Sequence, residues 1–133
     1  MRVKEIAQKA GVSAETVRYY VRIGLLKPSD SDKSGYRRFS ASHLNMLRFI
    51  MRAKQLGFTL SEIGEILRMA HRGRTPCPLV RDIVKRRVKD NKVDLEALRS
   101  LQARMENALA RWEHMRDGVP DGDAICVLIE SIT

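Results

Sequence analysis

The sequence predicts a mainly α-helical protein in which a compact N-terminal unit of short helices is followed by one long helix. Apolar residues recur in steps of four and three along residues 76–115, which is the heptad pattern of a coiled-coil helix. No proline or glycine interrupts residues 79–117. Residues 3–24 show two short helical patterns around a glycine, which is typical of a helix-turn-helix.

The net positive charge of the 133-residue chain is confined to its first half. Residues 1–74 hold fifteen Lys/Arg against six Asp/Glu, whereas residues 75–133 hold ten of each. A basic half beside a neutral half is typical of a nucleic-acid-binding module joined to another element. The alternative is a solvated basic surface without a partner.

The N-terminus has no apolar run of signal-peptide length, and no stretch approaches the roughly 18 apolar residues of a membrane span. We therefore expect a cytoplasmic protein without a membrane partner. The two cysteines are 49 positions apart, and a disulfide is not expected in a reducing compartment. Lone thiols in that compartment are more often inert or metal-binding.

The helix-turn-helix begins with a predicted helix over residues 3–10 that ends at Gly11, and Ser13 is placed to cap a second helix over residues 14–23. The second helix of this motif enters the major groove of DNA. Its arginine side chains suit guanine edges or phosphates, and tyrosine hydroxyls suit phosphate oxygens. A plain two-helix corner, the alternative, would not need them. The face expected to be exposed carries Thr16, Arg18, Tyr19, Tyr20 and Arg22.

The sequence Gly-Tyr-Arg-Arg-Phe at residues 35–39 has the composition of a wing that reaches the DNA backbone, although a surface β-turn with incidental charge is the alternative. Ser40 is placed to cap a third helix over residues 41–56. A fourth helix begins near residues 59–62, with Thr59 or Ser61 as its cap. The candidate DNA contacts are Lys4, Ser13, Thr16, Arg18, Tyr19, Tyr20, Tyr36, Arg37 and Arg38.

The long helix is expected to start with Thr75 as its cap and Pro76 in its first position. Forty residues of helix span roughly 60 Å, so a chain this short cannot bury the stripe itself and a partner helix is predicted. Asn91 and Gln102 occupy two seam positions, where polar residues either fix the register or are simply tolerated. The apolar seam residues are Val84, Val88, Leu95, Leu98, Met105, Leu109 and Trp112.

The C-terminal segment is acidic and contains a loop rich in glycine and proline over residues 117–123. A short helix is predicted over residues 124–132, with Asp123 as its cap and Cys126 in its first turn. Cys77 lies in the first turn of the long helix, where the helix dipole favours a thiolate. In an antiparallel coiled coil, Cys77 of one subunit lies beside Cys126 of its partner. Two ordinary half-buried thiols are the alternative.

The chain resembles the MerR family of bacterial transcription regulators over essentially all of its length. The resemblance rests on Val-Ser-Ala-Glu-Thr-Val-Arg-Tyr-Tyr at residues 12–20, Gly-Leu-Leu at 24–26 and the wing sequence at 35–39. It implies a winged helix-turn-helix DNA-binding domain with connector helices over residues 1–74. It also implies an antiparallel coiled-coil dimerisation helix over residues 75–116 and a C-terminal metal loop with a short helix over residues 117–133.

The resemblance to the short, metal-sensing branch of this family implies a metal site that contains Cys77 and Cys126. Where the mercury sensors have a third cysteine, nine residues before Cys126, this chain has Asp117. The site is then either two thiolates alone or two thiolates with an added oxygen or nitrogen ligand from Asp117, Asp121, Asp123 or His114. Such donors admit zinc, cadmium, lead, mercury and cobalt.

The function implied is that of a homodimer that binds a palindromic promoter operator. Metal binding would then distort the DNA so that RNA polymerase transcribes a metal resistance or efflux gene. The rival hypotheses are a thiol redox sensor on the same scaffold and an effector-free DNA-bending protein. An enzyme is not expected, because no nucleophile–base set is recognisable and the three histidines lie in separate elements.

Overall fold

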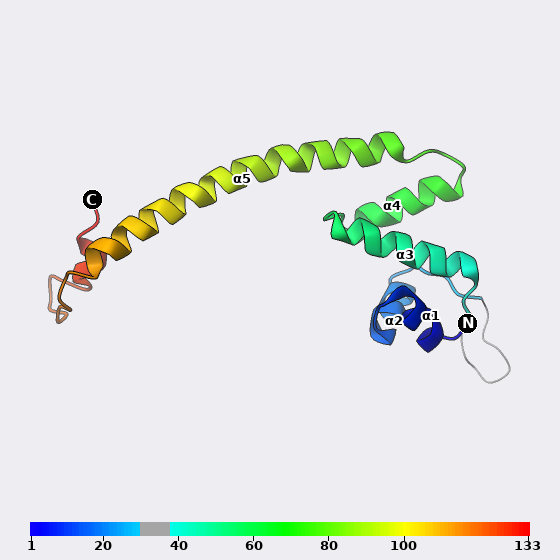
Figure 1. The fold of residues 1–133 in the computed structure, drawn as a ribbon, viewed down its shortest axis with the longest axis horizontal. Coiled ribbons are helices and arrows are strands. Elements are labelled where there is room, and N and C mark those ends of the chain that lie inside the picture. Colours follow the sequence, from blue (N-terminus) through cyan, green and yellow to red (C-terminus); the bar gives the residue numbers. More distant parts are fainter. Residues whose placement is uncertain (30–37) are drawn as a thin grey trace. The chain divides into compact units, whose positions relative to one another are not determined.

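The computed structural model describes residues 1–29 and 38–133, and the regular secondary structure within them is helical apart from one isolated β-bridge (Figure 1). It divides into two compact units, Met1–Leu79 and Val80–Thr133, which are considered separately. None of the helices in this part of the chain is long and apolar enough to cross a membrane. The helices are α1 (Val3–Ala10), α2 (Ala14–Arg22), α3 (Ala41–Gln55), α4 (Leu60–His71), α5 (Cys77–Trp112) and α6 (Val127–Glu130).

The predicted helix-turn-helix is confirmed in the pair α1 and α2, which pack against each other (Figure 1). Gly11 ends α1 with a positive φ of 74°, a left-handed conformation that glycine adopts at little cost. Ser13 caps α2 as expected, because its hydroxyl accepts a hydrogen bond from the Thr16 N–H at 3.0 Å. Helix α2 ends at Arg22, one residue earlier than predicted.

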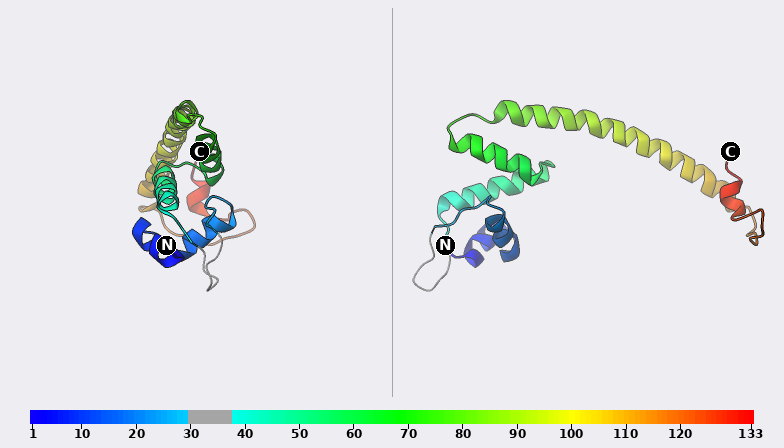
Figure 2. Two further views of the ribbon diagram at one scale, coloured as in Figure 1. Left: turned by 90° about the vertical axis from the view of Figure 1, so that its right-hand side faces the viewer. Right: turned by 180° about the vertical axis from the view of Figure 1, so that it is seen from behind.

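One hydrophobic core joins the four short helices of the first unit. Helix α3 packs against both α1 and α4, which Figure 2 shows from two further sides. Complete burial of large aliphatic side chains supplies most of the stability of a small domain. The fully buried side chains are Ile6, Val17, Leu26, Leu47, Ile50 and Ile63.

The base of the predicted wing is closed by backbone pairing. The Ser29 N–H donates to the Arg38 carbonyl at 3.0 Å, in an antiparallel bridge between the residues that flank 30–37. Phe39 is buried, and it exchanges two backbone hydrogen bonds of 2.7 Å with Met1. Of the predicted wing contacts, Arg38 lies at this base, whereas Tyr36 and Arg37 lie outside the described residues.

Capping boxes start α3 and α4. Ser40 caps α3 as predicted, and the His43 Nδ1 accepts the Ser40 N–H at 2.9 Å. The His43 Nε2 lies 2.8 Å from the Lys27 carbonyl, so the neutral Nε2–H tautomer satisfies both contacts. Thr59 is the cap of α4, and its own backbone N–H donates a hydrogen bond of 2.8 Å to the Glu62 carboxylate.

Helix α5 is a single helix of 36 residues, about 54 Å long. It begins at Cys77 rather than at Pro76, and the Thr75 hydroxyl accepts the Cys77 N–H at 3.3 Å. The seam side chains in its middle and second half are largely open, with 56% of Leu95, 59% of Leu98 and 57% of Met105 exposed. A row of open leucines and methionine along one helix face requires a partner in water.

The C-terminal helix is shorter than predicted. Helix α6 is one turn, Val127–Glu130, and not a helix over residues 124–132. Asp123 does not cap it; instead the Asp121 carboxylate accepts the N–H groups of Asp123 and Ala124 at 2.7 and 2.8 Å. Side-chain oxygens that capture backbone donors in this way compete with helix formation. Cys126 therefore precedes the helix rather than lying in its first turn.

Candidate DNA-binding surface and metal loop

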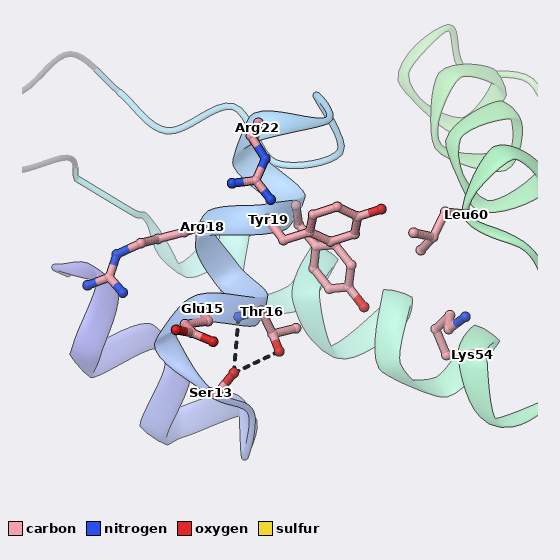
Figure 3. Close-up of a pocket in the computed structure, with 9 residues that line it drawn as sticks. Ser13, Glu15, Thr16, Arg18, Tyr19, Arg22, Lys54 and Leu60 are labelled. Carbon is pink, nitrogen blue, oxygen red and sulfur yellow. Dashed lines mark hydrogen bonds between the residues drawn. The ribbon is translucent and has the colours of Figure 1, made fainter.

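The exposed side of α2 lines a broad, open hollow on the first unit (Figure 3). Figure 3 shows Arg18 extending away from the helices that carry Lys54 and Leu60. The Arg22 guanidinium lies 5.3 Å from the centre of the Tyr19 ring, a cation–π contact that orders both side chains. The residues that line the hollow are Ser13, Glu15, Thr16, Arg18, Tyr19, Tyr20, Arg22, Lys54 and Leu60.

Tyr20 corrects the predicted exposed face of α2. Its side chain is only 6% exposed, whereas Tyr19 is 41% exposed. Burial, with a smaller contribution from the neighbouring Tyr19, raises the pKa of Tyr20 above its ordinary value. Tyr20 is thus a core residue that also borders the hollow, and its phenol stays protonated at neutral pH.

Ser13 and Thr16 stabilise the first turn of α2. Their hydroxyls lie 2.8 Å apart, and the Ser13 oxygen also accepts the Thr16 N–H. Both side chains therefore hold the start of α2 in place, next to the position where the dipole of the helix favours a phosphate.

Three lining residues were not predicted from the sequence, namely Glu15 on α2, Lys54 and Leu60. Lys54 lies near the end of α3 and Leu60 begins α4, and both border the hollow. The basic residues in the last turn of α3 were the available signal for Lys54. Lys4, a predicted DNA contact, is exposed on α1 but does not line this hollow.

The hollow carries three cationic side chains, Arg18, Arg22 and Lys54, against one carboxylate, Glu15. An arginine on the exposed side of a recognition helix can form a bidentate contact with the edge of one guanine, and a lysine binds phosphate as a point charge. An open, cationic and partly aromatic surface of this kind fits the backbone and groove of a nucleic acid.

The C-terminal loop folds back onto the end of α5 within the second unit. Arg111 donates from Nη1 to the Ser131 carbonyl at 3.1 Å, and the Trp112 indole N–H donates to the Ser131 hydroxyl at 3.3 Å. The Ser131 hydroxyl in turn donates to the Leu128 carbonyl at 2.5 Å. These bonds hold α6 against the last turn of α5, as Figure 1 shows.

The two ends of the loop meet where Gly118 approaches Val127. A side-chain carbon added at Gly118 would collide with the Val127 Cγ1. Asp117 and Cys126 are the chain neighbours of these two residues. The loop therefore brings the backbones that carry Asp117 and Cys126 close together, although they are nine residues apart in sequence.

We expect Gly118→Ala to open the loop, because the new methyl group overlaps Val127. A cost of about 1–3 kcal/mol would speed amide exchange at Glu130 and Ser131 by roughly 5- to 150-fold. Hydrogen-exchange mass spectrometry measures this. Gly122→Ala is the matched control, because a methyl group there meets nothing within 4 Å. Equal exchange in the two variants would contradict the close approach.

The predicted metal ligands differ in their exposure and in the hydrogen bonds that they already make. Cys77 is an exposed free thiol at the first position of α5, and Cys126 is a half-buried free thiol. The backbone N–H groups of Asp123 and Ala124 hold the pKa of Asp121 below its usual range. Asp121 thus already serves the turn, which leaves Asp117 as the carboxylate beside the closure of the loop.

No group of three His, Cys, Asp or Glu side chains within residues 1–29 and 38–133 of one chain is arranged to hold a metal ion. His114 and Asp123 are exposed. Thiolates and carboxylates are nevertheless the kinds of ligand that soft and borderline divalent ions accept.

Comparison with known proteins adds a family match to this geometry. Residues 1–70 match the family described as "MerR HTH family regulatory protein", and residues 44–108 match "MerR, DNA binding". The mercuric resistance operon regulatory protein of Bacillus cereus is 33% identical over 116 residues, which cover 87% of this chain and 88% of that protein.

Two crystal structures are similar in fold. The transcription regulator PbrR691 from Ralstonia metallidurans CH34, in complex with lead(II), has a TM-score of 0.76 and 25% identity, covering 98% of both chains. HiNmlR, a MerR family regulator lacking the sensor domain and bound to promoter DNA, has a TM-score of 0.56 and 26% identity. This match covers 85% of this chain and 86% of that one.

Proposed function

The chain belongs to the MerR family of helix-turn-helix transcription regulators, and on that premise we propose that it is a metal-responsive activator that binds a palindromic operator as a homodimer. It is a regulator and not an enzyme. The observation that carries the proposal is the pair of free thiols at the start of α5 and beside α6 on a chain whose first unit contains the helix-turn-helix.

The open side of α2 supports DNA binding. Arg18 and Arg22 project from the helix that the motif inserts into the major groove, and Lys54 adds a third positive charge at the same hollow. Tyr19 supplies a hydroxyl that suits a phosphate oxygen. Two copies related by a two-fold axis read two half-sites, so the operator is palindromic.

The flank of the α5 seam supports an antiparallel dimer. Heptad position e, next to the seam, carries Lys85 and Lys92 in the first half of the helix, Arg99 just past its middle, and Glu106 and Glu113 toward its end. Position e of one antiparallel helix faces position e of the other. The basic first part of one helix therefore lies along the acidic last part of its partner, whereas a parallel pair would not gain this complementarity.

The proposed metal site lies between subunits. Cys77 of one subunit and Cys126 of the other would supply two thiolates, and Asp117, which precedes the Gly118 that approaches Val127, would supply an oxygen. Bound there, a divalent soft or borderline ion such as mercury, lead, cadmium, zinc or cobalt would tie the start of one α5 to the loop of the other. The site residues hold the ion by charge and orientation, and the α5 helices carry the change to the DNA-binding units.

The proposed output is activation of a metal resistance or efflux gene. Two recognition helices that move with the dimer distort the promoter between them, and the cost of that distortion depends on the DNA sequence. RNA polymerase then engages promoter elements that were misaligned in the relaxed DNA.

Transcription from the native operator, measured with each of the five metals in turn under reducing conditions, tests the proposal. We expect one metal, or a small group of them, to raise transcription with purified protein and polymerase. A response to an oxidant and to no metal would replace the proposal with a thiol redox sensor. Operator output that is unaffected by both, and by Cys77→Ser, would indicate an effector-free DNA-bending protein.

A further inference from the structure

We propose that Asn91 of one subunit pairs with Gln102 of the other across the α5 seam, and that this amide pair sets the register of the homodimer. The inference rests on the proposed antiparallel dimer and adds which residues face each other in it. It follows from the spacing of the seam, from the chemistry of the two amides and from their position on α5.

The spacing restricts which seam positions can be level with each other. Along α5 the steps from residue 84 to residue 112 alternate between four and three. On an antiparallel partner the same steps run in the opposite order. The seam residues of the two helices therefore lie level with each other only if each residue that follows a step of three faces one that follows a step of four. This allows Asn91 to face Gln102, and then Leu95 faces Leu98 and Val88 faces Met105.

Sliding the helices by one heptad in either direction separates the amides. One slide places Asn91 against Leu109 and Gln102 against Leu98 of the partner. The other places Asn91 against Leu95 and Gln102 against Val84. An amide held against aliphatic side chains in a closed seam leaves donors and acceptors unpaired, which is costly. Because the dimer is two-fold symmetric, a slid register leaves the amides of both subunits unpaired, whereas the aligned register forms two amide pairs.

The structure places both amides where this pairing needs them. Asn91 and Gln102 are exposed on α5. The Gln102 Nε2 donates to the Glu106 carboxylate at 2.8 Å, which orients the amide and leaves its oxygen to accept from Asn91 of the partner. Gln102 also lines a shallow groove on α5 together with Leu95 and Leu98, the residues that meet at the two-fold axis in this register.

The aligned register has a consequence for the proposed metal site. It sets Arg81 level with Trp112, the last residue of the partner's α5. Cys77 lies one helical turn before Arg81, so it lies beside the chain that leaves the partner helix toward Asp117. A slide of one heptad would move Cys77 by about 10 Å along the partner and away from that loop.

Disulfide cross-linking of the full chain, in a Cys77→Ser/Cys126→Ser background, tests the register. Val88→Cys/Met105→Cys reports the aligned register, and these positions are too far apart within one helix to bond to each other. Val88→Cys/Leu98→Cys and Leu95→Cys/Met105→Cys report the two slid registers. We expect the first pair to form covalent dimers under mild oxidation roughly tenfold faster than either of the others. Faster cross-linking of a slid pair would overturn the register.

The role of the amides is tested by adding Asn91→Leu/Gln102→Leu to all three reporters. We expect the preference for Val88→Cys/Met105→Cys to fall, while the exchange Asn91→Gln/Gln102→Asn retains it. An unchanged preference in the double-leucine protein would show that the amides do not set the register. The mass of the unmodified protein in solution separates failure of the proposed dimer from failure of the register. A monomer refutes the proposed dimer, whereas a dimer that cross-links in a slid register refutes this inference alone.

Discussion

Arg18→Ala is expected to abolish the operator footprint at protein concentrations that saturate the DNA with the unmodified protein. Arg18 is exposed on α2 and extends away from the helices that carry Lys54 and Leu60, so its loss removes a proposed DNA contact without removing core packing. A bidentate arginine–guanine contact contributes about 1–3 kcal/mol to binding, and each of the two subunits loses one such contact. Footprinting at fixed salt measures the loss, because affinity for DNA depends steeply on ionic strength.

Lys89→Ala is the matched control for Arg18→Ala. It removes the same single charge from an exposed position on α5 that belongs to the second unit and lies neither on the seam nor at its e positions. We expect a nearly normal footprint and an unchanged dimer mass for Lys89→Ala, and an unchanged dimer mass for Arg18→Ala. A normal footprint in Arg18→Ala would refute the assignment of Arg18 as a DNA contact.

Cys126→Ser is expected to keep operator binding and lose the metal response entirely. The side chain belongs to the second unit, and serine preserves the size of the residue that precedes α6 while removing the thiolate. Soft ions prefer sulfur over hydroxyl oxygen by a wide margin, so two-subunit binding would fail. In vitro transcription with the responsive metal, beside an operator-binding assay without metal, separates the two effects.

Cys77→Ser should reproduce the loss seen with Cys126→Ser, because each cysteine contributes half of the proposed site. Asp117→Ala then distinguishes a site of two thiolates alone from one with a carboxylate. A weakened response in Asp117→Ala identifies the carboxylate as a ligand, and an intact response excludes it. Unchanged induction in Cys126→Ser would remove Cys126 from the site.

The first unit was predictable because its signals are local. Gly11, Ser13, Ser40 and Thr59 end or start helices through their own backbone conformation or hydroxyl groups, and each does so in the structure. The exposed side of α2 was predicted less well. Tyr20 lies three residues after the buried Val17, so it shares the core face that the helical period assigns to both.

The C-terminal loop was beyond sequence reasoning because side chains and a non-local contact shape it. Composition alone favours a helix over 124–132, but Asp121 takes two backbone donors and Glu130 accepts the Ile125 N–H at 3.1 Å. The approach of Gly118 to Val127 joins residues from opposite ends of the loop. No periodicity marks such a contact, although the two glycines and the proline indicated a turn.

The hydrogen bond from the Trp112 indole to Ser131 gives the protein an optical signal of its own. Trp112 is its one tryptophan, it is half-buried, and it lies at the junction of α5 with the C-terminal loop. Release of Ser131 would expose the indole to water and shift its fluorescence emission to longer wavelength. Opening of the C-terminal loop can therefore be followed in the native chain by emission spectroscopy, without a label and without DNA.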